Sequence, residues 1–407
     1  MNNQYVLVIS PRDNEVDLVK ELGYGVILIR KNISFDEMFS VEVPVEIDLN
    51  DEEIVVGKCK ELSEKYNVVG VYTLNEYRIP LAAKVGEILE INSFLSYETA
   101  ITCRNKKLAR KKLNNSNVSS VKFILIRKLD NLNEKLEGFS FPVIVKPSND
   151  SGSKNVYLCK DYNEVKQAVD VISNSKLNLV GQTLDPEAIV EEYLDGPEYS
   201  IESYTIDGKT TIVGVTEKVV TPFPLSVEVG HNFPAVLEED IETSIHETVI
   251  NALDVIGVDF GVTHTEVKVT SDGPKVIEVN ARPGGDRITD LVEYVTGIDL
   301  RRIALRINLG LPIKNSCCNK ELVPSSSIRF LIADKEGYIS FNENFRAESI
   351  KEIHWYVNKG ERVNKTTSNF DRIGYYIVDG NKKESSKKIA DSLNECFELA
   401  ISELVEM

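Results

Sequence analysis

The chain has 407 residues, of which 42% are hydrophobic and 27% are charged, and this predicts two or three globular domains around a large core. Its formal net charge of −17 argues against non-specific binding to nucleic acids or to anionic membranes. No apolar run is long enough for a signal peptide or a membrane span, and no cysteine pair has CxxC spacing, so we expect a cytoplasmic protein with reduced thiols.

Residues 1 to about 95 alternate strand and helix patterns. The continuous apolar run from Tyr5 to Ile9 is typical of a buried parallel strand. A helical pattern over 15–22 and strand patterns over 25–29 and 68–74 complete a βαβ arrangement, which predicts a small open parallel sheet. No GxGxxG turn follows the first strand, so we do not expect a dinucleotide in this part of the chain.

A dense basic run, Cys103 to Lys112, lies in a segment that we predict to be one helix over 96–113. Lys106 and Arg110 are four residues apart and therefore share a helix face, where they could hold a phosphate. A solvated helix face is the alternative explanation of such a run.

A small polar loop, Ser148 to Lys154, separates a strand that ends in Lys146 and Pro147 from a second strand over 155–159. Free backbone N–H groups in such a loop can bind phosphate oxygens. The loop is not a Walker A loop, because GxxxxGK[ST] is missing and a strand follows it. We interpret it as a hairpin lid over a nucleotide, and an ordinary hairpin turn is the alternative.

Residues 188–202 then read as strand, sharp turn and strand, and 211–219 as a further strand of the same sheet. We interpret residues 222–234, which include His231, as a long loop that contributes to specificity. A helix is predicted over 240–256 from the spacing of its apolar residues.

Residues 261–286 read as a β-hairpin around the turn formers Ser271 to Pro274. Pairing outward from Asp272 predicts that Glu266 lies directly opposite Glu278. The same register pairs Val269 with Lys275, Val267 with Ile277, and His264 with Asn280. One face then carries His264, Glu266, Lys268, Val276, Glu278, Asn280 and Arg282. The other face, which suits a core, carries Thr265, Val267, Val269, Ile277, Val279 and Ala281.

Two carboxylates directly opposed across a strand pair lie about 5 Å apart and destabilise a sheet, so a cation or a shared proton should offset them. Glu266, Glu278 and the side-chain oxygen of Asn280 form the hard oxygen set that Mg²⁺ takes beside phosphate oxygens. A solvated charged face on an ordinary hairpin is the alternative interpretation.

The last part of the chain, 311–407, contains short strand patterns over 326–332, 350–357 and 372–379 and a helix from Ser385 to about Val405. These predict a small α+β appendage. Trp355 alternates with apolar neighbours, so we expect it in a core rather than in a ligand site.

Taken in chain order, these motifs resemble the signature of the ATP-grasp superfamily. It comprises a lysine on a helix, a lysine before a Gly/Ser loop, Glu-Glu-Tyr-Leu-Asp-Gly-Pro-Glu at 191–198, and Glu-Val-Asn-Ala-Arg at 278–282. Within the superfamily, residues 280–286, Thr296-Gly297-Ile298-Asp299 and the C-terminal appendage resemble the L-amino acid ligases, which make dipeptides. Biotin carboxylase, D-alanine–D-alanine ligase and several purine-pathway ligases share the core.

The resemblance implies an α/β fold, α+β overall, in three domains. These would be an N-terminal open parallel α/β domain at 1–95, an ATP-grasp domain at 96–310 with a lid at about 118–190, and a C-terminal α+β appendage at 311–407.

The resemblance also implies roles for individual residues. ATP phosphates would be held by Lys106, Lys146 and the loop residues Ser151, Gly152 and Ser153. The adenine would meet Glu191 and the backbone around Glu192 and Leu194, and the ribose would meet Glu198. Asn105 stands where many members have Asp, so Lys107 is a second candidate for the role of Lys106.

On the hairpin, the resemblance implies that Glu266, Glu278 and Asn280 ligate two Mg²⁺ (or Mn²⁺) ions, with Glu278 bridging them. Arg282 would stabilise the charge that develops as a carboxylate attacks the γ-phosphate. His231 and His264 are candidates for substrate contact, with a plain structural histidine as the alternative for each. Gly285 and Arg287 are candidates for binding a substrate carboxylate.

The function implied is an ATP- and Mg²⁺-dependent carboxylate–amine ligase that forms an amide, as in a dipeptide, through an acyl phosphate and releases ADP and phosphate. One alternative keeps the fold and changes the acyl donor or the amine. A non-catalytic nucleotide-binding subunit is another, although such a subunit would not need the full acidic and basic set. The expected partners are small molecules and, as in related enzymes, a second copy of the chain.

Overall fold

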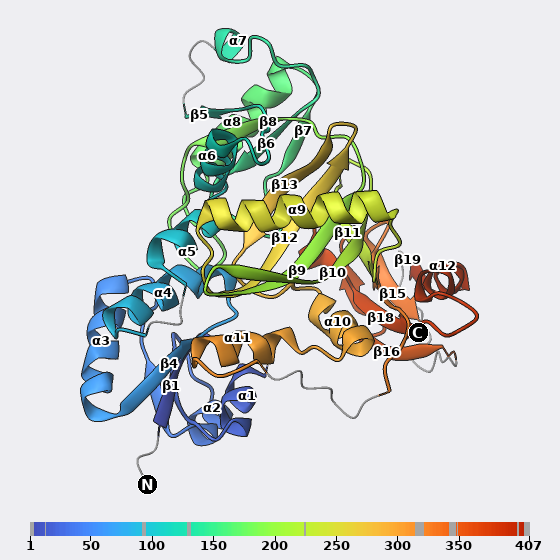
Figure 1. Ribbon diagram of the computed structural model, residues 1–407. Coiled ribbons are helices and arrows are strands. Elements are labelled where there is room, and N and C mark those ends of the chain that lie inside the picture. The colour runs from blue at the N-terminus through green and yellow to red at the C-terminus, as the bar shows by residue number, and fades with distance from the viewer. Residues whose placement is uncertain are drawn as a thin grey trace.

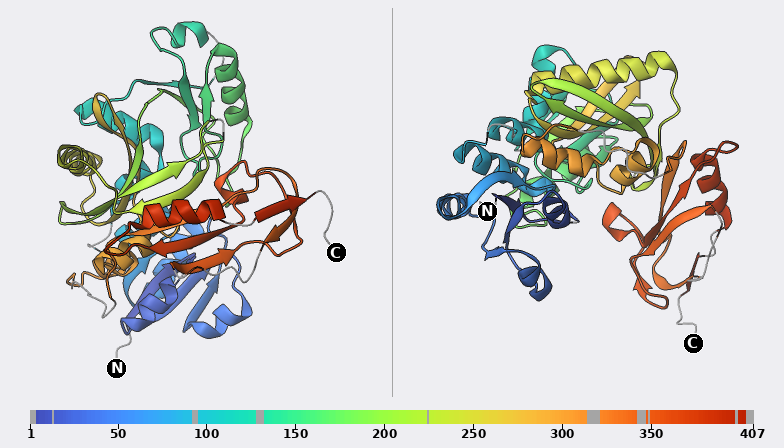
Figure 2. Two further views of the ribbon diagram at one scale, coloured as in Figure 1. Left: turned by 90° about the vertical axis from the view of Figure 1, so that its right-hand side faces the viewer. Right: turned by 60° about the horizontal axis from the view of Figure 1, so that its bottom comes forward.

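Four β-sheets and the helices that cover them form the framework of the protein (Figures 1 and 2). The computed structural model describes residues 4–12, 14–91, 95–127, 132–223, 225–313, 321–341, 347, 349–396 and 399–402. In Figure 1 the N-terminal sheet lies at the bottom, a small sheet lies at the top, and the C-terminal strands lie at the right. Among these residues, none of the helices combines the length and the apolar character that a bilayer crossing requires.

The N-terminal part forms a parallel sheet. Its elements are β1 (Gln4–Ile9), α1 (Glu15–Glu21), β2 (Gly25–Arg30), α2 (Phe35–Ser40), β3 (Val43–Glu46), α3 (Glu52–Lys65), β4 (Asn67–Tyr72), the 3₁₀ helix η1 (Glu76–Arg78) and α4 (Ile79–Ile88). The strand order is β3-β2-β1-β4, and every neighbouring pair is parallel. Strands β1 and β2 are apolar and buried on both faces, as parallel strands between layers must be, so the predicted open parallel sheet is confirmed.

A second sheet, which we name the lid sheet, carries the Gly/Ser loop. Its elements are β5 (Phe123–Ile126), α7 (Leu132–Lys135), β6 (Val143–Pro147), β7 (Tyr157–Cys159), α8 (Tyr162–Asn174) and β8 (Ala188–Glu192). The strands are antiparallel in the order β5-β8-β6-β7. The apolar side of α8 packs on the sheet through Val165, Val169 and Ile172. The loop over 148–154 leaves β6 and leads to β7, as the sequence predicts.

An eight-stranded antiparallel sheet forms the centre of the molecule. Its strands are β9 (Glu198–Ile206), β10 (Lys209–Val220), β11 (Glu228–Phe233), β12 (Gly261–Thr270), β13 (Gly273–Asn280), β14 (Ser326–Leu331), β16 (Ile350–Trp355) and β18 (Gly374–Asp379). Their order is β13-β12-β9-β10-β11-β14-β18-β16. The associated helices are α5 (Tyr97–Arg104), α6 (Lys106–Ser116), α9 (Glu239–Ile256), α10 (Ile288–Thr296) and α11 (Leu300–Asn308).

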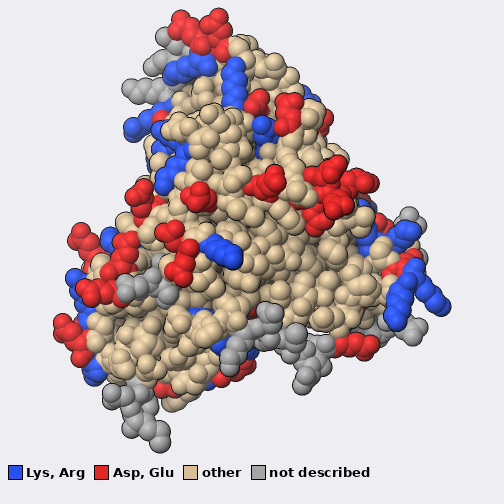
Figure 3. All heavy atoms as spheres, viewed as in Figure 1, with Lys and Arg blue, Asp and Glu red and all other residues tan. Residues whose placement is uncertain are grey.

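The two faces of the central sheet have different neighbours. Helix α9 covers one face, where Val249 packs with Val267 and Val279 (Figure 1). On the other face α10 and α11 share a core with the N-terminal sheet, in which Val262 packs with Leu305. The first turn of α9 carries Glu239, Asp240 and Glu242, and acidic side chains gather at this end of the helix in Figure 3. Acidic residues at the start of a helix stabilise it through a favourable interaction with the helix dipole.

The predicted helix over 96–113 is wrong in one respect, because the structure breaks it into α5 and α6. Asn105 lies between them with extended backbone angles, and its side-chain oxygen accepts hydrogen bonds from Lys107 N and Leu108 N. Asn105 is therefore the N-cap of α6. The break places Lys106 at the first turn of a new helix rather than in the middle of a long one.

The C-terminal strands predicted by the sequence are present, but they extend the central sheet. Strand β14 pairs with β11, and β18 pairs with β14 and β16. A separate sheet contains β15 (Gly337–Phe341), β17 (Arg362–Val363) and β19 (Leu399–Ser402). The terminal helix α12 (Ser386–Cys396) is shorter than predicted, because β19 follows it and pairs with β15. Trp355 stacks on Phe341 at a ring-centroid distance of 3.6 Å, so the expected core position is confirmed.

We predict that Gly196→Ala destabilises the fold. Gly196 has φ of +133°, and a Cβ there would lie 2.0 Å from the carbonyl oxygen of Val269. The backbone of the hairpin cannot give way easily, so we expect a loss of about 1–3 kcal/mol in the free energy of unfolding. Urea unfolding measures it. Gly57→Ala is the matched control, because Gly57 lies inside α3 with open space around it and should gain about 0.5–1 kcal/mol. Equal effects of both substitutions would contradict the prediction.

Candidate active site

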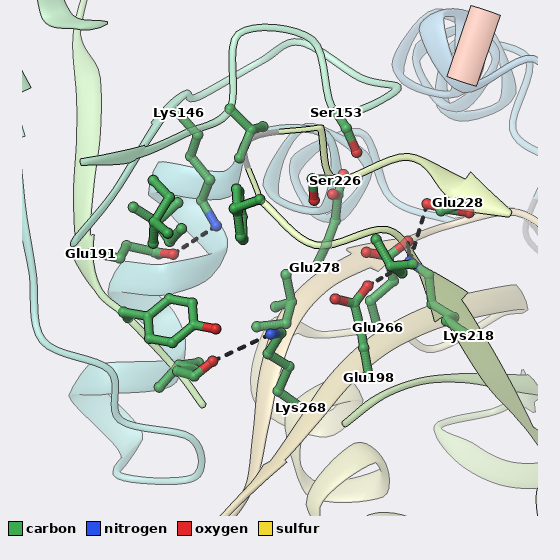
Figure 4. Close-up of a pocket in the computed structure, with 18 of the residues that line it drawn as sticks. Lys146, Ser153, Glu191, Glu198, Lys218, Ser226, Glu228, Glu266, Lys268 and Glu278 are labelled. Atoms are coloured by element: carbon green, nitrogen blue, oxygen red, sulfur yellow. Dashed lines mark hydrogen bonds and ion pairs between the residues drawn. The ribbon is translucent and has the colours of Figure 1, made fainter. Parts of the chain in front are cut away.

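A cavity of about 500 Å³ lies between the lid sheet and the central sheet. Its walls come from β6, β7 and β8 on one side and from β9, β10, β12 and β13 on the other, with the loop over 148–154 across it. The labelled side chains in Figure 4 point into this space, and most of them are charged. The cavity thus gathers residues from segments that are far apart in the sequence.

The hairpin of β12 and β13 supplies two opposed carboxylates. Glu266 pairs with Glu278, and His264 with Asn280, as the sequence predicts. Beyond Glu266 the predicted register is wrong, because a β-bulge pairs Val267 with Val276 and Val269 with Pro274.

Because of the bulge, the predicted faces of the hairpin are wrong for two residues, Val276 and Ile277. Val276 lies in the core beneath α9, whereas Ile277 lines the cavity next to Glu278. Lys268 lines the cavity as predicted. The extra residue in β13 is the physical reason, since it moves an apolar side chain from the core face to the cavity face.

Lys106 balances one of the two carboxylates. Its ammonium lies 2.8 Å from Glu278 Oε1 and donates a second hydrogen bond to the carbonyl oxygen of Asp150 at 2.9 Å. The second candidate, Lys107, pairs with Asp185 and Glu187 and does not line the cavity. The structure therefore favours Lys106 over Lys107 as the cavity lysine.

Lys218 balances the other carboxylate and is a residue that the sequence reasoning missed. Its ammonium lies 2.6 Å from Glu198, 3.1 Å from Glu266 and 3.3 Å from Glu228 (Figure 4). Burial would lower the pKa of Lys218, but the three carboxylates outweigh burial and hold it well above the usual value. The only sequence signal is a single lysine near the apolar end of a predicted strand, and its partners are brought by β9, β11 and β12.

Lys146 and Glu191 form a buried ion pair on the lid side. Lys146 Nζ lies 2.6 Å from Glu191 Oε2, and Arg110 Nε donates to Glu191 Oε1 at 2.8 Å. The suggestion that Arg110 shares a phosphate-binding face with Lys106 is therefore wrong, because Arg110 is buried against Glu191. Burial would raise the pKa of Glu191, but Arg110 and Lys146 outweigh burial and lower it to about 2. Glu191 thus fixes the position of Lys146.

The strand end after Glu191 forms a slot with one polar and one apolar side. The side chain of Glu192 accepts from Lys122 N at 2.6 Å, and Glu192 N donates to the carbonyl oxygen of Lys122 at 3.0 Å, so Lys122 holds this strand end at the cavity. The carbonyl oxygen of Leu194 accepts from Lys268 Nζ at 3.3 Å (Figure 4). The apolar wall consists of Ile144, Val156, Leu158 and Ile277. Such a slot suits a flat aromatic ring system with polar edges, as in a nucleotide base.

Arg282 lies at the end of the hairpin and contacts the N-terminal part of the chain. Its Nε donates to Glu76 Oε2 at 2.5 Å, and Arg104 lies 3.8 Å from the same carboxylate. Burial would lower the pKa of Arg282, but Glu76 outweighs burial and raises it. Asn280 lies beside the same acid, and its amide satisfies its neighbours only when the nitrogen faces them, at 3.2 Å from Glu278 Oε1 and 3.3 Å from Glu76 Oε1.

The two histidines proposed for substrate contact, His231 and His264, are buried. His264 pairs with Glu202 through Nδ1 and lies 3.5 Å from Glu266 through Nε2. Burial would lower the pKa of His264, but the two carboxylates raise it to about 9, so the ring carries a charge at neutral pH. His231 is not in a loop, as the sequence suggested, but in β11, opposite Lys218. Its Nε2 lies 3.5 Å from Glu228 and from Asp286.

The structure places Gly285 and Arg287 outside the residues that line the cavity. Arg287 is the N-cap of α10 and has positive φ, and its guanidinium pairs with Glu352 at 2.7 and 3.0 Å. Asp286 pairs with Arg372 through two hydrogen bonds of 2.7 Å. Asp286 and Arg287 both have positive φ, a strained conformation for residues other than glycine, and their ion pairs with Arg372 and Glu352 hold them in place.

The donor set on the hairpin fits a divalent cation. Glu266 and Glu278 are directly opposed, line the cavity and have oxygen ligands of the hard kind. A second acidic group, Glu228, His231 and Asp286, has ligand atoms within 4.8 Å of one another. His231 and Asp286 do not line the cavity, whereas Glu266 and Glu278 both do, so the hairpin set fits a metal in the cavity better.

Two family models match the chain. Residues 139–290 match the ATP-grasp domain, and residues 329–401 match the L-amino acid ligase C-terminal domain 2. Dapdiamide A synthase of Enterobacter agglomerans is 25% identical over 73% of this chain and 72% of its own length. Alanine–anticapsin ligase of Bacillus subtilis is 27% identical over 70% of this chain and 64% of its own length.

The fold is also that of a solved ligase. The crystal structure of an L-amino acid ligase from Bacillus licheniformis has a TM-score of 0.81 and 24% identity, and the match covers 99% of this chain and all of that chain. Residues 139–290 form an ATP-grasp domain, and the chain has the ATP-grasp fold, as its motifs predicted. Its residues 329–401 form an L-amino acid ligase C-terminal domain.

We predict that Glu191→Gln destabilises the protein, because Arg110 and Lys146 would then be buried without a counter-charge. A loss of about 3 kcal/mol in the free energy of unfolding is expected near neutral pH. The folded-state pKa of about 2 lies below the ordinary 4.5, so the stabilisation is present above pH 4.5 and is lost as the pH falls towards 2.

Urea unfolding of both proteins at several pH values measures this effect. The stability difference between wild type and Glu191→Gln should narrow as the pH falls below 4.5. Glu187→Gln is the control, because Glu187 pairs with Lys107 at a more exposed position and should cost less than about 1 kcal/mol. A difference that does not depend on pH would contradict the assignment.

Proposed function

We propose that the protein is an ATP- and Mg²⁺-dependent ligase that joins the carboxylate of one amino acid to the amine of another. The observation that carries the proposal is the cavity itself, where the opposed Glu266 and Glu278 pair with Lys218 and Lys106 under a small-residue loop, with Lys146 in the opposite wall. The names of the two ligases and of the solved structure support the same class of reaction. The C-terminal domain supports an amino acid as substrate.

The chemistry explains why such a site needs cations. A carboxylate is a poor acyl donor because oxide is a poor leaving group. Transfer of the γ-phosphate of ATP to the carboxylate gives an acyl phosphate and ADP, and attack by the amine then forms the amide and releases phosphate. Phosphoryl transfer depends on positioning and on neutralising charge more than on a protein nucleophile.

The lysines would bind the phosphates of ATP. Lys106 and Lys146 have the roles that the motif implies, and we add Lys218, which points into the same space (Figure 4). The backbone N–H groups of Ser151, Gly152 and Ser153 would cover the phosphates. The lysines now neutralise carboxylates, so they are already held in the cavity before ATP binds.

The remaining roles follow the same geometry. The slot after Glu191, with the backbone of Glu192 and Leu194, would hold the adenine, and Glu198 would bind the ribose. Glu266, Glu278 and Asn280 would hold Mg²⁺ or Mn²⁺, which supplies Lewis-acid neutralisation of the phosphate charge. Arg282, which Glu76 holds at the end of the hairpin, would stabilise the charge that develops on the transferred phosphate.

We further propose that the three predicted domains, 1–95, 96–310 and 311–407, with a lid at about 118–190, are the functional units. His231, His264, Gly285 and Arg287 remain candidates for the substrate side of the site. A cytoplasmic enzyme that forms a homodimer is consistent with the proposal.

Phosphate release from ATP and Mg²⁺ across a panel of amino acids, singly and in pairs, tests the function. We expect release with a pair and a matching amount of dipeptide by mass spectrometry. Release with one acid and a non-amino-acid amine would change the assigned substrate. No release with any combination would refute the enzyme.

We predict that Glu278→Gln abolishes turnover and leaves the fold intact, because the amide cannot replace the charge of a metal-binding carboxylate. Phosphate release should fall by at least about 100-fold, in line with the loss of a major electrostatic group. Circular dichroism and thermal unfolding check the fold. Glu61→Gln on the exposed side of α3 is the control and should keep full activity. Undiminished phosphate release by Glu278→Gln would refute the metal assignment.

A further inference from the structure

Tyr77 connects the N-terminal part of the chain to the loop over the cavity. It lies in η1, and its side chain is almost fully buried. The hydroxyl of Ser151 donates to the hydroxyl oxygen of Tyr77 at 2.6 Å. The carbonyl oxygen of Tyr77 accepts from Gln182 Nε2 at 2.9 Å. One residue therefore contacts both the loop and a second segment of the lid region.

The ring of Tyr77 is held in place before it meets the loop. The guanidinium of Arg104 lies 5.0 Å from the ring centroid and that of Arg12 lies 5.9 Å from it, both within the range of cation–π attraction. The side chain of Asn75 accepts from Tyr77 N at 3.2 Å. A hydroxyl on a fixed ring forms a hydrogen bond at little entropic cost.

The C-terminal part of the chain touches the same loop from another side. A Cβ on Gly152 would lie 2.9 Å from two ring carbons of Phe370, so the ring packs closely against the bare glycine. The neighbouring Asn369 accepts from Glu228 N at 2.9 Å and thereby ties this segment to β11. Phe370 is 62% exposed even with the loop in contact, so the loop is one of its few neighbours.

The loop is also linked to the charged floor of the cavity. Lys106 donates to the carbonyl oxygen of Asp150 and to Glu278, so the backbone next to Ser151 is joined to the hairpin. The loop thus has three supports, which come from η1, from the segment around Phe370 and from α6. All three lie outside the lid sheet and the hairpin that form the cavity walls.

We propose that Tyr77 is a positioning residue which, together with Phe370, clasps the loop over the cavity and keeps water from the acyl phosphate. The proposal rests on the proposed function. When the loop opens early, a water oxygen attacks the carbonyl carbon and the bond from that carbon to the phosphate oxygen breaks. The water loses two protons in all, and free carboxylate and phosphate are released without an amide. ATP is then consumed without product.

The test uses the full-length Tyr77→Phe variant, which removes the hydroxyl and keeps the ring near both guanidiniums. Loss of one neutral hydrogen bond should raise the open fraction of the loop about 2- to 10-fold. We expect the ratio of phosphate released to amide formed to rise accordingly, with little change in KM for ATP. Hydrogen exchange of residues 148–154 in the absence of substrates should become faster by a similar factor.

Two further variants separate a clasp from a merely structural tyrosine. Tyr97→Phe removes a hydroxyl that bonds Glu52 away from the loop, and it should change neither the ratio nor the exchange. Phe370→Ala should raise both, and the double variant with Tyr77→Phe should raise them further. An unchanged ratio and unchanged exchange in Tyr77→Phe would overturn the proposal, as would an equal effect of Tyr97→Phe.

The two proposals fail in different ways. A wild-type protein that forms no amide with any pair refutes the ligase. Hydrogen exchange of residues 148–154 in Tyr77→Phe then tests by itself whether Tyr77 holds the loop closed. A wild-type protein that forms amide while Tyr77→Phe keeps a one-to-one ratio refutes the clasp and leaves the ligase standing.

Discussion

The neutralisation of two carboxylates that oppose one another on the hairpin wall of the cavity is the interaction on which the site depends. Glu266 and Glu278 are opposed on one hairpin, and each has a lysine from a different element, Lys218 from β10 and Lys106 from α6. In a partly buried site such pairs are strong, and a missing partner is costly. The pairs therefore tie α6, β10 and the hairpin together at one point.

The same pairs prepare the site for a nucleotide. Phosphates and a metal would exchange partners with the lysines and the carboxylates, so that each charge keeps a counter-charge. The lysines are already held at the cavity by ion pairs, as Lys146 is by Glu191. Their side chains therefore need little reorganisation during the reaction.

The N-terminal and C-terminal parts of the chain both contribute contacts to the site. The N-terminal sheet presents Tyr77 and Glu76, which contact the loop and Arg282. The C-terminal strands extend the central sheet, and Arg372 pairs with Asp286 just beyond the hairpin. The fold thus brings three parts of the chain to one loop and one hairpin.

The sequence by itself determined the local features: the buried parallel strands, the hairpin with Glu266 opposite Glu278, the Gly/Ser loop after Lys146, and the family they resemble. These depend on residue type and on spacing within a few positions. The tertiary structure alone decided the bulge that turns Ile277 to the cavity, the break at Asn105, and the partners of Arg110 and Lys218. The bulge depends on strand register, and the partners of Arg110 and Lys218 depend on charges from distant segments, so the pattern of neighbouring residues does not encode them. At the break, Asn105 caps the new helix locally, but Lys106 N also donates to the carbonyl oxygen of Ser148 at 2.8 Å, a contact that only the tertiary structure provides.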